Sequence, residues 1–286
     1  MDNSGNLCGL ALSQIAAWSL PDDPSLGTCD VNASLPALQR GSVWRPKQVE
    51  LLWDSLMSGL PIGALLLSEF DRELGSRQLT VSGTPKSDRL PTHHLIDGQQ
   101  RALAIALGFL DVWGCGDIGN CRYALWVDLA KPKLDDRAFL FRMITSAHPW
   151  GYKKADPAER LSAVQCREAL ATYRAVYPRE LLQHIEFRAG KIPLKYCWPH
   201  DAEAPVPVRF LLDAVRESDP AEALQEKLNA LSIWRDARVR GRIEKRLESD
   251  DTFFNRSPCG VRRMKSLARI LTSMSVMSFT LFSASS

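Results

Sequence analysis

The sequence predicts an α/β (α+β) domain followed by a mostly helical domain, and three patterns support this prediction. Residues 46–58 carry apolar side chains at helical spacing, and residues 62–67 form a continuous apolar run typical of a buried strand. A further strand is predicted at 92–96, with helical spacing again from residue 99. Helical patterns prevail after residue 156, so we expect the architecture to change there.

The composition is that of an ordinary globular protein, with 286 residues, of which 45% are hydrophobic and 24% charged. A net charge of +3 is too small to require a nucleic-acid partner, although a local basic patch is compatible with it. No apolar run reaches the roughly 18 residues of a transmembrane helix, so we expect no membrane partner. Seven cysteines are scattered without a Cys-x-x-Cys pair or a preceding signal peptide, which favours reduced thiols in the cytoplasm.

The helix at 46–58 is the most regular local pattern in the first half of the chain. Pro46 suits the first helical position, Gly59 suits the C-terminal cap, and Pro61 prevents continuation. The shorter apolar stretch at 10–20 fits either a helix or a strand. The face of the helix that we expect to be buried comprises Val49, Leu52, Trp53, Leu56 and Met57.

Between the predicted strands, residues 71–91 are polar and rich in Gly, Ser and Pro. We expect a surface loop or hairpin without core residues, the alternative being a lid over a neighbouring site. Residues 121–129 and 138–144 alternate and predict half-buried strands. The aromatic turn at 148–152 is expected to fill a seam between domains, the alternative being a platform for a stacked base.

In the second half, helices are predicted at 156–176, 208–215 and 219–247, with a Pro-rich connection at 177–207. The last helix is rich in basic side chains mixed with acidic ones. Such a pattern usually marks a solvated face, with contact to the DNA backbone as the alternative. The basic residues are Arg235, Arg238, Arg240, Arg242, Lys245 and Arg246.

The residues best suited to chemistry lie at 94–103, where a strand, an Asp-Gly turn and a helix start follow one another. A helix start stabilises an anion through its N–H groups and dipole, and Arg101 adds a guanidinium fork that suits phosphate. Asp97 stands where a carboxylate can bind a metal ion, a ribose hydroxyl or Arg101 itself. The alternative is an ordinary turn, with Asp97 as N-cap and with Gln99 and Gln100 in solvent.

Three motifs in this order and spacing resemble the N-terminal domain of GmrSD-type, modification-dependent restriction endonucleases. They are LQRGSVW at 38–44, GLPIGALLL at 59–67 and HHLIDGQQRALAI at 93–105. The resemblance is specific over about 30–150 and looser to about 250. It implies a ParB/sulfiredoxin-like fold for the N-terminal domain, a nucleoside triphosphate as cofactor, and a role in defence against phage DNA.

The resemblance also implies roles for individual residues around the DGQQR motif. Asp97 is the implied metal ligand, with Mg²⁺ bridging it to the phosphates of GTP or ATP. Asp97, Gln100 and Arg101 are the implied catalytic residues, a glutamine orienting the attacking water. Besides Asp97, only His94 is near enough in sequence to act as a general base, and a strand histidine is more often structural. The implied cofactor-binding residues are Gln39, Arg40, Gly98, Gln99, Gln100 and Arg101, with Trp44 anchoring the loop of the first two.

We divide the chain into an N-terminal extension (1–30), a ParB-like α/β domain (31–152), a helical domain (153–256) and an atypical tail (257–286). From Ser257 the sequence departs from the family pattern and contains no Asp or Glu. Our hypothesis is a truncated or frame-shifted end, so the tail need not pack as a native element.

The function expected from these motifs is nucleoside-triphosphate-dependent sensing or restriction of foreign, modified DNA. One alternative is a DNA-binding adaptor without nucleotide hydrolysis, in which Arg40 and Arg101 contact DNA phosphates. Another is an inactive remnant of a longer restriction protein. We expect no nuclease activity from this chain alone, because its five histidines lack the neighbours of a His-Asn-His motif, and a separate domain or chain is expected to cut the DNA.

Overall fold

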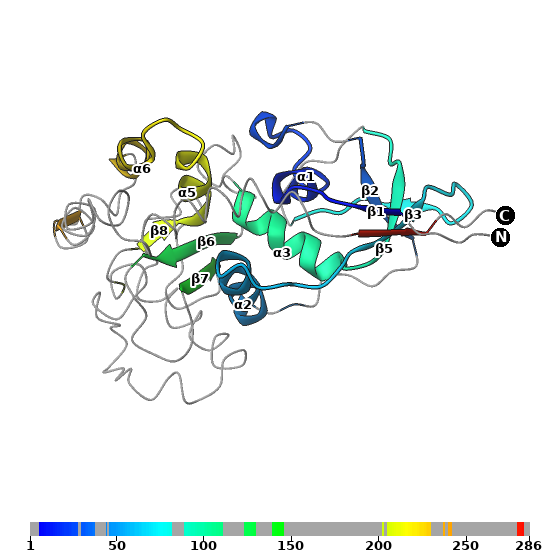
Figure 1. Cartoon of the computed structure of the whole chain (residues 1–286), viewed down its shortest axis with the longest axis horizontal. Coiled ribbons are helices and arrows are strands. Elements are labelled where there is room, and N and C mark those ends of the chain that lie inside the picture. The colour runs from blue at the N-terminus through cyan, green and yellow to red at the C-terminus, as the bar shows by residue number, and fades with distance from the viewer. Residues whose placement is uncertain are drawn as a thin grey trace, which may run out of the picture.

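The computed structural model contains two β-sheets with helices packed around them. Figure 1 shows α3 (Gln99–Phe109) running through the middle, between the larger sheet at one end and α5 and α6 with the smaller sheet at the other. The mixed α/β content predicted from the sequence is therefore confirmed. The structure describes residues 6–27, 30–37, 44, 46–81, 89–110, 123–129, 139–145, 202, 205–229, 237, 240–241 and 279–282.

The larger sheet has six strands and mixed direction. Its β5 lies at the centre, parallel to β2 on one side and antiparallel to β3 on the other. The strands of this sheet, in spatial order, are β1 (Asn6–Cys8), β9 (Phe279–Phe282), β3 (Leu66–Glu69), β5 (His93–Asp97), β2 (Ala33–Pro36) and β4 (Ser76–Arg77).

The smaller sheet has three antiparallel strands, β7 (Leu140–Thr145), β6 (Tyr123–Asp128) and β8 (Pro205–Pro207). Both strands predicted near 121–144 are confirmed, but β6 is not half-buried. Residues 125–129 are all buried, because β6 is the central strand and α3 and α5 also contact it. The strand β8 lies in the stretch predicted as a connection, so this sheet joins the two halves of the sequence.

The helices largely follow the predicted pattern. The apolar stretch near the N-terminus is a helix, α1, and it packs against α3 with Ile15 and Ala16 fully buried. The helix predicted at 219–247 begins at Pro220 and is described to Asn229. The helix predicted at 156–176 and the aromatic turn predicted at 148–152 lie outside the described residues. The remaining helices are α1 (Leu12–Ala17), the short 3₁₀ helix η1 (Pro24–Leu26), α2 (Pro46–Met57), α5 (Val208–Ala214) and α6 (Pro220–Asn229).

The helix α2 ends one residue before the predicted boundary and buries the predicted face. Its C-terminus is closed by a hydrogen bond from the Leu60 N–H to the carbonyl of Ser55, 2.9 Å long. On the same helix, the carboxylates of Glu50 and Asp54 accept backbone hydrogen bonds of 2.9 Å each from the N–H groups of Met143 and Phe139. These bonds cover the edge of the smaller sheet beside α2.

We expect Leu56→Ala to lower the free energy of unfolding by about 2–5 kcal/mol, because the Leu56 side chain is 1% exposed and its loss leaves a cavity. Chemical denaturation of both proteins measures the difference. Leu51→Ala on the same helix is the matched control, since Leu51 is 38% exposed and should cost far less. Equal losses in the two variants would show that this face of α2 is not the buried one.

Two expectations about the segments after α2 were wrong. The predicted strand at 62–67 begins only at Leu66, and its burial alternates rather than covering both faces. Pro61 and the left-handed backbone of Gly63, with φ of 84°, hold the preceding residues out of the sheet. The stretch predicted to lack core residues contributes Leu79 and Val81, which are 0% and 4% exposed.

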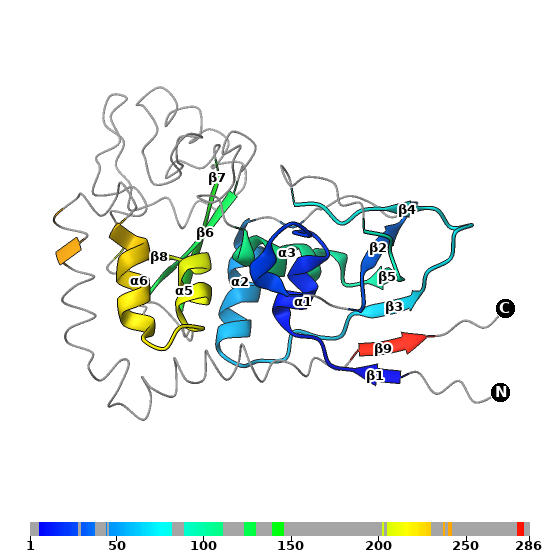
Figure 2. The same cartoon turned by 90° about the horizontal axis from the view of Figure 1, so that it is seen from above.

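The described part of the tail belongs to the larger sheet. Four of its residues form β9, which pairs antiparallel with β1 and parallel with β3. Figure 2 shows β9 lying between these strands. This strand therefore packs in the sheet, and the hypothesis of a truncated or frame-shifted end stays a prediction.

A buried arginine links the N-terminal segment to the second half of the chain. Arg209 on α5 is 7% exposed and donates hydrogen bonds to the carboxylate of Asp23 and to the carbonyl of Phe109, at the C-terminus of α3. It also donates to the Ser25 hydroxyl and to the Asp213 carboxylate, 2.9 Å in each case. Burial alone raises the pKa of the Asp23 carboxyl. The hydrogen bond and positive charge of Arg209, together with hydrogen bonds from Ser25, outweigh this effect and lower the pKa overall.

Candidate functional site

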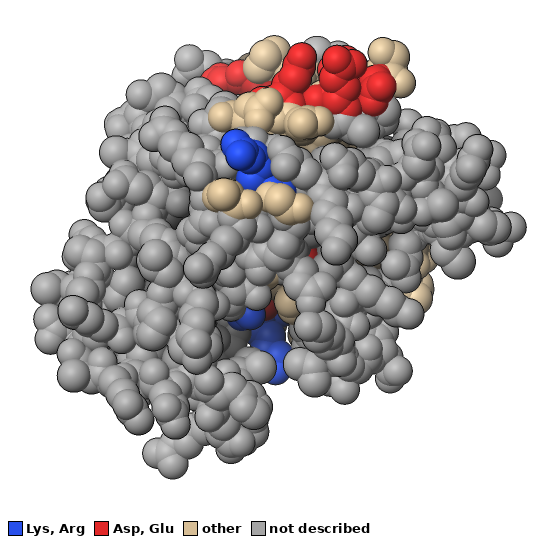
Figure 3. Space-filling view, turned by 90° about the vertical axis from the view of Figure 1, so that its left-hand side faces the viewer, with Lys and Arg blue, Asp and Glu red and all other residues tan. Residues whose placement is uncertain are grey.

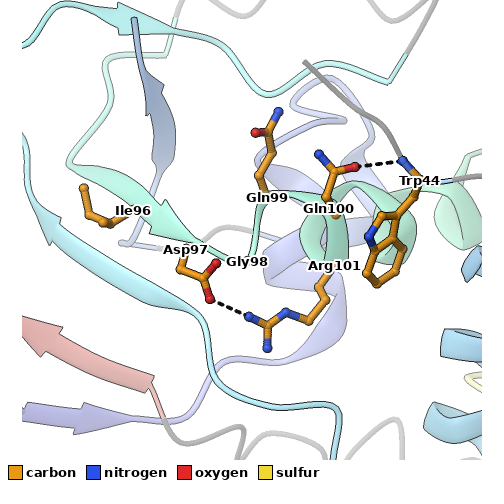
Figure 4. Close-up of a pocket in the computed structure, with 7 residues that line it drawn as sticks. All are labelled: Trp44, Ile96, Asp97, Gly98, Gln99, Gln100 and Arg101. Atoms are coloured by element: carbon orange, nitrogen blue, oxygen red, sulfur yellow. Dashed lines mark hydrogen bonds and ion pairs between the residues drawn. The ribbon is translucent and has the colours of Figure 1, made fainter. Parts of the chain in front are cut away.

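A cavity of about 370 Å³ opens where β5 ends and α3 begins. Gly98 makes the turn with φ of 100°, a left-handed conformation that most side chains disfavour, and its carbonyl accepts the first helical hydrogen bond, from Ala102. Side chains and backbone from both sides of the turn therefore face one space, as Figure 4 shows. The cavity is lined by Trp44, Ile96, Asp97, Gly98, Gln99, Gln100 and Arg101.

Arg101 is held by the protein rather than standing free at the helix start. Its Nη2 donates to Asp97 Oδ2 over 2.8 Å, and its Nη1 donates to the carbonyl oxygen of Ile62 over 3.1 Å (Figure 4 shows the first of these bonds). The side chain is 19% exposed, and that of Asp97 is 71% exposed. Of the partners expected for Asp97, the structure shows Arg101. The N-cap of α3 is Gly98 and not Asp97.

One glycine makes room for this guanidinium group, and a second makes room for the Leu65 side chain. A Cβ atom on Gly63 would lie 2.4 Å from Arg101 Nη1, and one on Gly98 would lie 2.2 Å from Leu65 Cδ2. Because such approaches are too close for real atoms, any side chain at either position would displace Arg101 or Leu65. The backbone around Arg101 is therefore shaped to its side chain.

The two glutamines differ in their surroundings. Gln100 Oε1 accepts a hydrogen bond of 3.2 Å from the backbone N–H of Trp44, which ties the segment before α2 to the start of α3. In Figure 4 the Gln99 side chain extends away from the pair of Asp97 and Arg101. Both glutamines are half-buried, so the expectation that they lie fully in solvent does not apply.

The start of α3 has the electrostatic character of an anion site. It contains no acidic residue in its first turn, and its N-cap has no side chain to bond the first N–H groups. The positive end of the helix dipole and the guanidinium of Arg101 therefore face the same cavity. The acidic group nearby, Asp97, is already paired with that arginine.

The histidines of β5 have structural surroundings. His94 is 0% exposed, its Nε2 lies 2.9 Å from the carbonyl of Asp71, and its ring stacks on that of Phe70 at 4.7 Å between centroids. It does not line the cavity. Burial lowers the pKa of His93, and the carboxylate of Glu69 partly offsets this shift.

Of the six predicted cofactor-binding residues, four line one cavity, and the other two are not among the described residues. Gly98, Gln99, Gln100 and Arg101 lie together, as does Asp97. Gln39 and Arg40 lie outside the described residues, whereas Trp44 from the same motif lines the cavity. Among the residues that are described, no group of three or more His, Cys, Asp or Glu side chains could hold a metal ion.

The sequence analysis does not predict that the segment after α2 contributes to the candidate site. The carbonyl of Ile62 binds Arg101, Gly63 gives its guanidinium space, and Leu65 packs against Gly98. A signal was present, because Pro61, Ile62 and Gly63 belong to the second of the three motifs. By itself, the residue pattern of that motif predicts the end of a helix and a strand, without a contact to Arg101.

One surface seen in the space-filling view is acidic. Figure 3 shows acidic side chains gathered at the top of the face that includes α6, whose exposed residues include Glu222 and Glu226. The basic stretch 235–246 is the one considered for contact with DNA. Only Ala237, Arg240 and Gly241 of this stretch are described, and Arg240 is exposed. The described part of α6 carries Glu222 and Glu226 with one lysine, Lys227, so it offers no excess of basic side chains to DNA phosphates.

Comparison with known proteins gives one match. Residues 27–256 match the family model described as "GmrSD restriction endonuclease, N-terminal domain". The match ends at Arg256. A search of curated proteins found no match. Within the described part of the chain, no helix has the length and apolar character needed to cross a membrane.

Proposed function

Because the chain belongs to the family of the GmrSD restriction endonuclease N-terminal domain, we propose that it is the nucleotide-dependent sensing component of a system that restricts foreign, modified DNA. The family itself links the chain to a DNA-acting restriction system. The observation that carries the finer proposal is the cavity at the start of α3, with Arg101 and Asp97 at its wall. The ParB/sulfiredoxin-like character of this domain is part of the same proposal.

In this proposal the cavity binds the triphosphate of GTP or ATP. The volume of about 370 Å³ lies within the range of small-molecule sites. The amides of the α3 start and the guanidinium of Arg101 supply the positive charge, and Gln99 and Gln100 supply amide groups at the rim. Gln39 and Arg40 are proposed to approach the same ligand from the preceding motif.

The residues present also fit a magnesium ion bound through the nucleotide. Mg²⁺ in such sites keeps several water ligands and takes one or two carboxylates, its remaining ligands being phosphate oxygens. Asp97 supplies one carboxylate that is 71% exposed and adjoins the cavity. When bound, the ion would neutralise phosphate charge, and Asp97 would turn from Arg101 toward it, leaving the guanidinium to the phosphates.

Hydrolysis of the triphosphate would need a water held in line with the phosphate. Gln100 lies at the cavity wall with its amide fixed by the Trp44 N–H, which suits orientation of a water molecule by the amide nitrogen. Asp97 is the acidic group in reach, since His94 is buried away from the cavity. We propose Asp97, Gln100 and Arg101 as the catalytic set, with DNA cleavage left to a separate nuclease domain or chain.

We expect Arg101→Ala to weaken binding of GTP or ATP in the presence of Mg²⁺ by about tenfold to hundredfold, because one charged hydrogen bond is worth about 1.5–3 kcal/mol. Arg101→Lys should recover little of this loss, since lysine keeps the charge but lacks the planar fork that reaches Asp97 and Ile62 together. Isothermal titration calorimetry measures both affinities, and a melting curve of each variant reports its folding.

The matched control is Arg72→Ala, an exposed arginine that does not line the cavity. It should leave nucleotide affinity unchanged. If Arg101→Ala folds and binds as tightly as the natural chain, Arg101 is not part of a nucleotide site. If the natural chain binds no triphosphate but binds DNA with a steep dependence on salt, the adaptor function replaces this proposal.

A further inference from the structure

A second hollow lies beside the polar cavity and has a different chemical character. Its volume is about 480 Å³, and its wall is mainly aliphatic. The helices α2 and α3 contribute Val49, Leu103 and Leu107, and β7 contributes Met143. A space lined in this way excludes charge and suits a flat apolar group.

The two hollows share part of their wall. Trp44 and Gln100 line both of them, and the hydrogen bond from the Trp44 N–H to Gln100 Oε1, 3.2 Å long, joins the two residues. A ligand that spans this wall would have one charged end at the start of α3 and one apolar end between α2 and α3. The two chemistries therefore occur next to each other.

We propose that the apolar hollow receives the base of the nucleoside triphosphate whose phosphates occupy the polar cavity. This inference rests on the proposed function, which places only the phosphates, and adds a site for the base. A nucleobase has apolar faces and a polar edge, and the hollow offers aliphatic side chains together with two polar groups, the Gln100 amide and the Thr80 hydroxyl. Trp44 provides an aromatic ring at the junction.

The hollow reaches the molecular surface at Thr80. Thr80, which lines it, is exposed, whereas its neighbours Leu79 and Val81 are 0% and 4% exposed. These two buried side chains hold the segment that carries Thr80 against the rest of the molecule. The rim of the hollow is therefore built on packed residues.

The test compares ligands with and without a base. Calorimetric titration of the full chain with Mg²⁺ should give a dissociation constant for at least one of ATP, GTP, CTP and UTP at least tenfold lower than that of inorganic triphosphate, a difference of about 1.4 kcal/mol. Thr80→Trp and Leu107→Trp place an indole in the hollow from two different elements. Each should remove this preference while leaving the affinity for inorganic triphosphate unchanged.

The control variant is Leu90→Trp, which adds the same indole at a side chain that is 83% exposed and lines neither hollow, and it should keep the preference. Equal affinities of the natural chain for inorganic triphosphate and all four nucleotides would overturn the inference while leaving the phosphate site standing. It is also overturned if both tryptophan variants fold and keep the preference, or if both lose inorganic triphosphate, since the two hollows would then not be separate subsites. Absence of binding by every triphosphate would remove the proposed function itself, and the base site with it.

Discussion

Arg209→Met should lower the free energy of unfolding by about 3–5 kcal/mol, the cost of removing one partner from a buried ionic network. The substitution keeps most of the side-chain volume but leaves the carboxylate of Asp23 without its cation and the carbonyl of Phe109 without a donor. Denaturation by urea measures the change. The effect should be large because Arg209 is 7% exposed and joins three separate segments.

Arg216→Met is the matched control, since Arg216 is exposed and donates one hydrogen bond of 2.8 Å to the Ser25 carbonyl. It should cost less than about 1 kcal/mol. The difference between the natural chain and Arg209→Met should also depend on pH. The pKa of Asp23 in the folded protein lies below its ordinary value of 3.8, so this stabilisation is present above pH 3.8 and is lost as the pH falls through the folded value. If the difference in free energy of unfolding between the two proteins stays constant across this acid range, Asp23 is not the group that Arg209 stabilises.

Gly108→Ala should destabilise the protein even though alanine favours a helix over glycine by about 1 kcal/mol. A Cβ atom at Gly108 would lie 2.0 Å from Trp53 Cζ2, and the indole has no room to move. Trp53 is 0% exposed, and its Nε1 donates a hydrogen bond of 2.8 Å to the Ala104 carbonyl. Overpacking of this kind costs about 1–3 kcal/mol or more and outweighs the gain in helix propensity.

The sign should reverse when the indole is removed. Trp53→Ala alone should cost about 3–5 kcal/mol, since a fully buried indole is lost. In that background, adding Gly108→Ala should stabilise the protein by up to about 1 kcal/mol, because only the helix propensity remains. A double-mutant cycle by urea denaturation measures this coupling. If Gly108→Ala has the same effect in both backgrounds, the contact with Trp53 is not what requires a glycine.

Much of the fold near the site could be predicted from the sequence because its signals are local. The helix α2 has a regular apolar stripe with Pro46 and Gly59 at its ends, and the order strand, turn and helix at 93–109 follows from a short periodic stretch. The candidate site was also predictable as a group, since six of its seven lining residues are consecutive from Ile96 to Arg101. Local patterns determine such features without knowledge of the tertiary structure.

The remaining features depend on contacts between distant segments. The partner of Arg101 at Ile62 is a backbone carbonyl 39 residues away, so no side-chain pattern announces it. Leu79 and Val81 are isolated apolar residues in a polar stretch, and only the sheet beside them makes them core residues. The burial of residues 125–129 likewise depends on β8 and α5, which come about 80 residues later in the chain.

That late pairing has a consequence for how the protein is assembled. Each sheet takes a strand from the far end of the sequence, β8 in the smaller sheet and β9 in the larger one. During synthesis, β2 to β5 with α2 and α3 can associate once residue 109 has emerged, because their contacts lie within that stretch. The edge of β3 and one edge of β6 stay without these partners until much later, and long loops must close before they are covered. The nascent chain therefore exposes two open strand edges, at which pairing with another copy competes with its own completion.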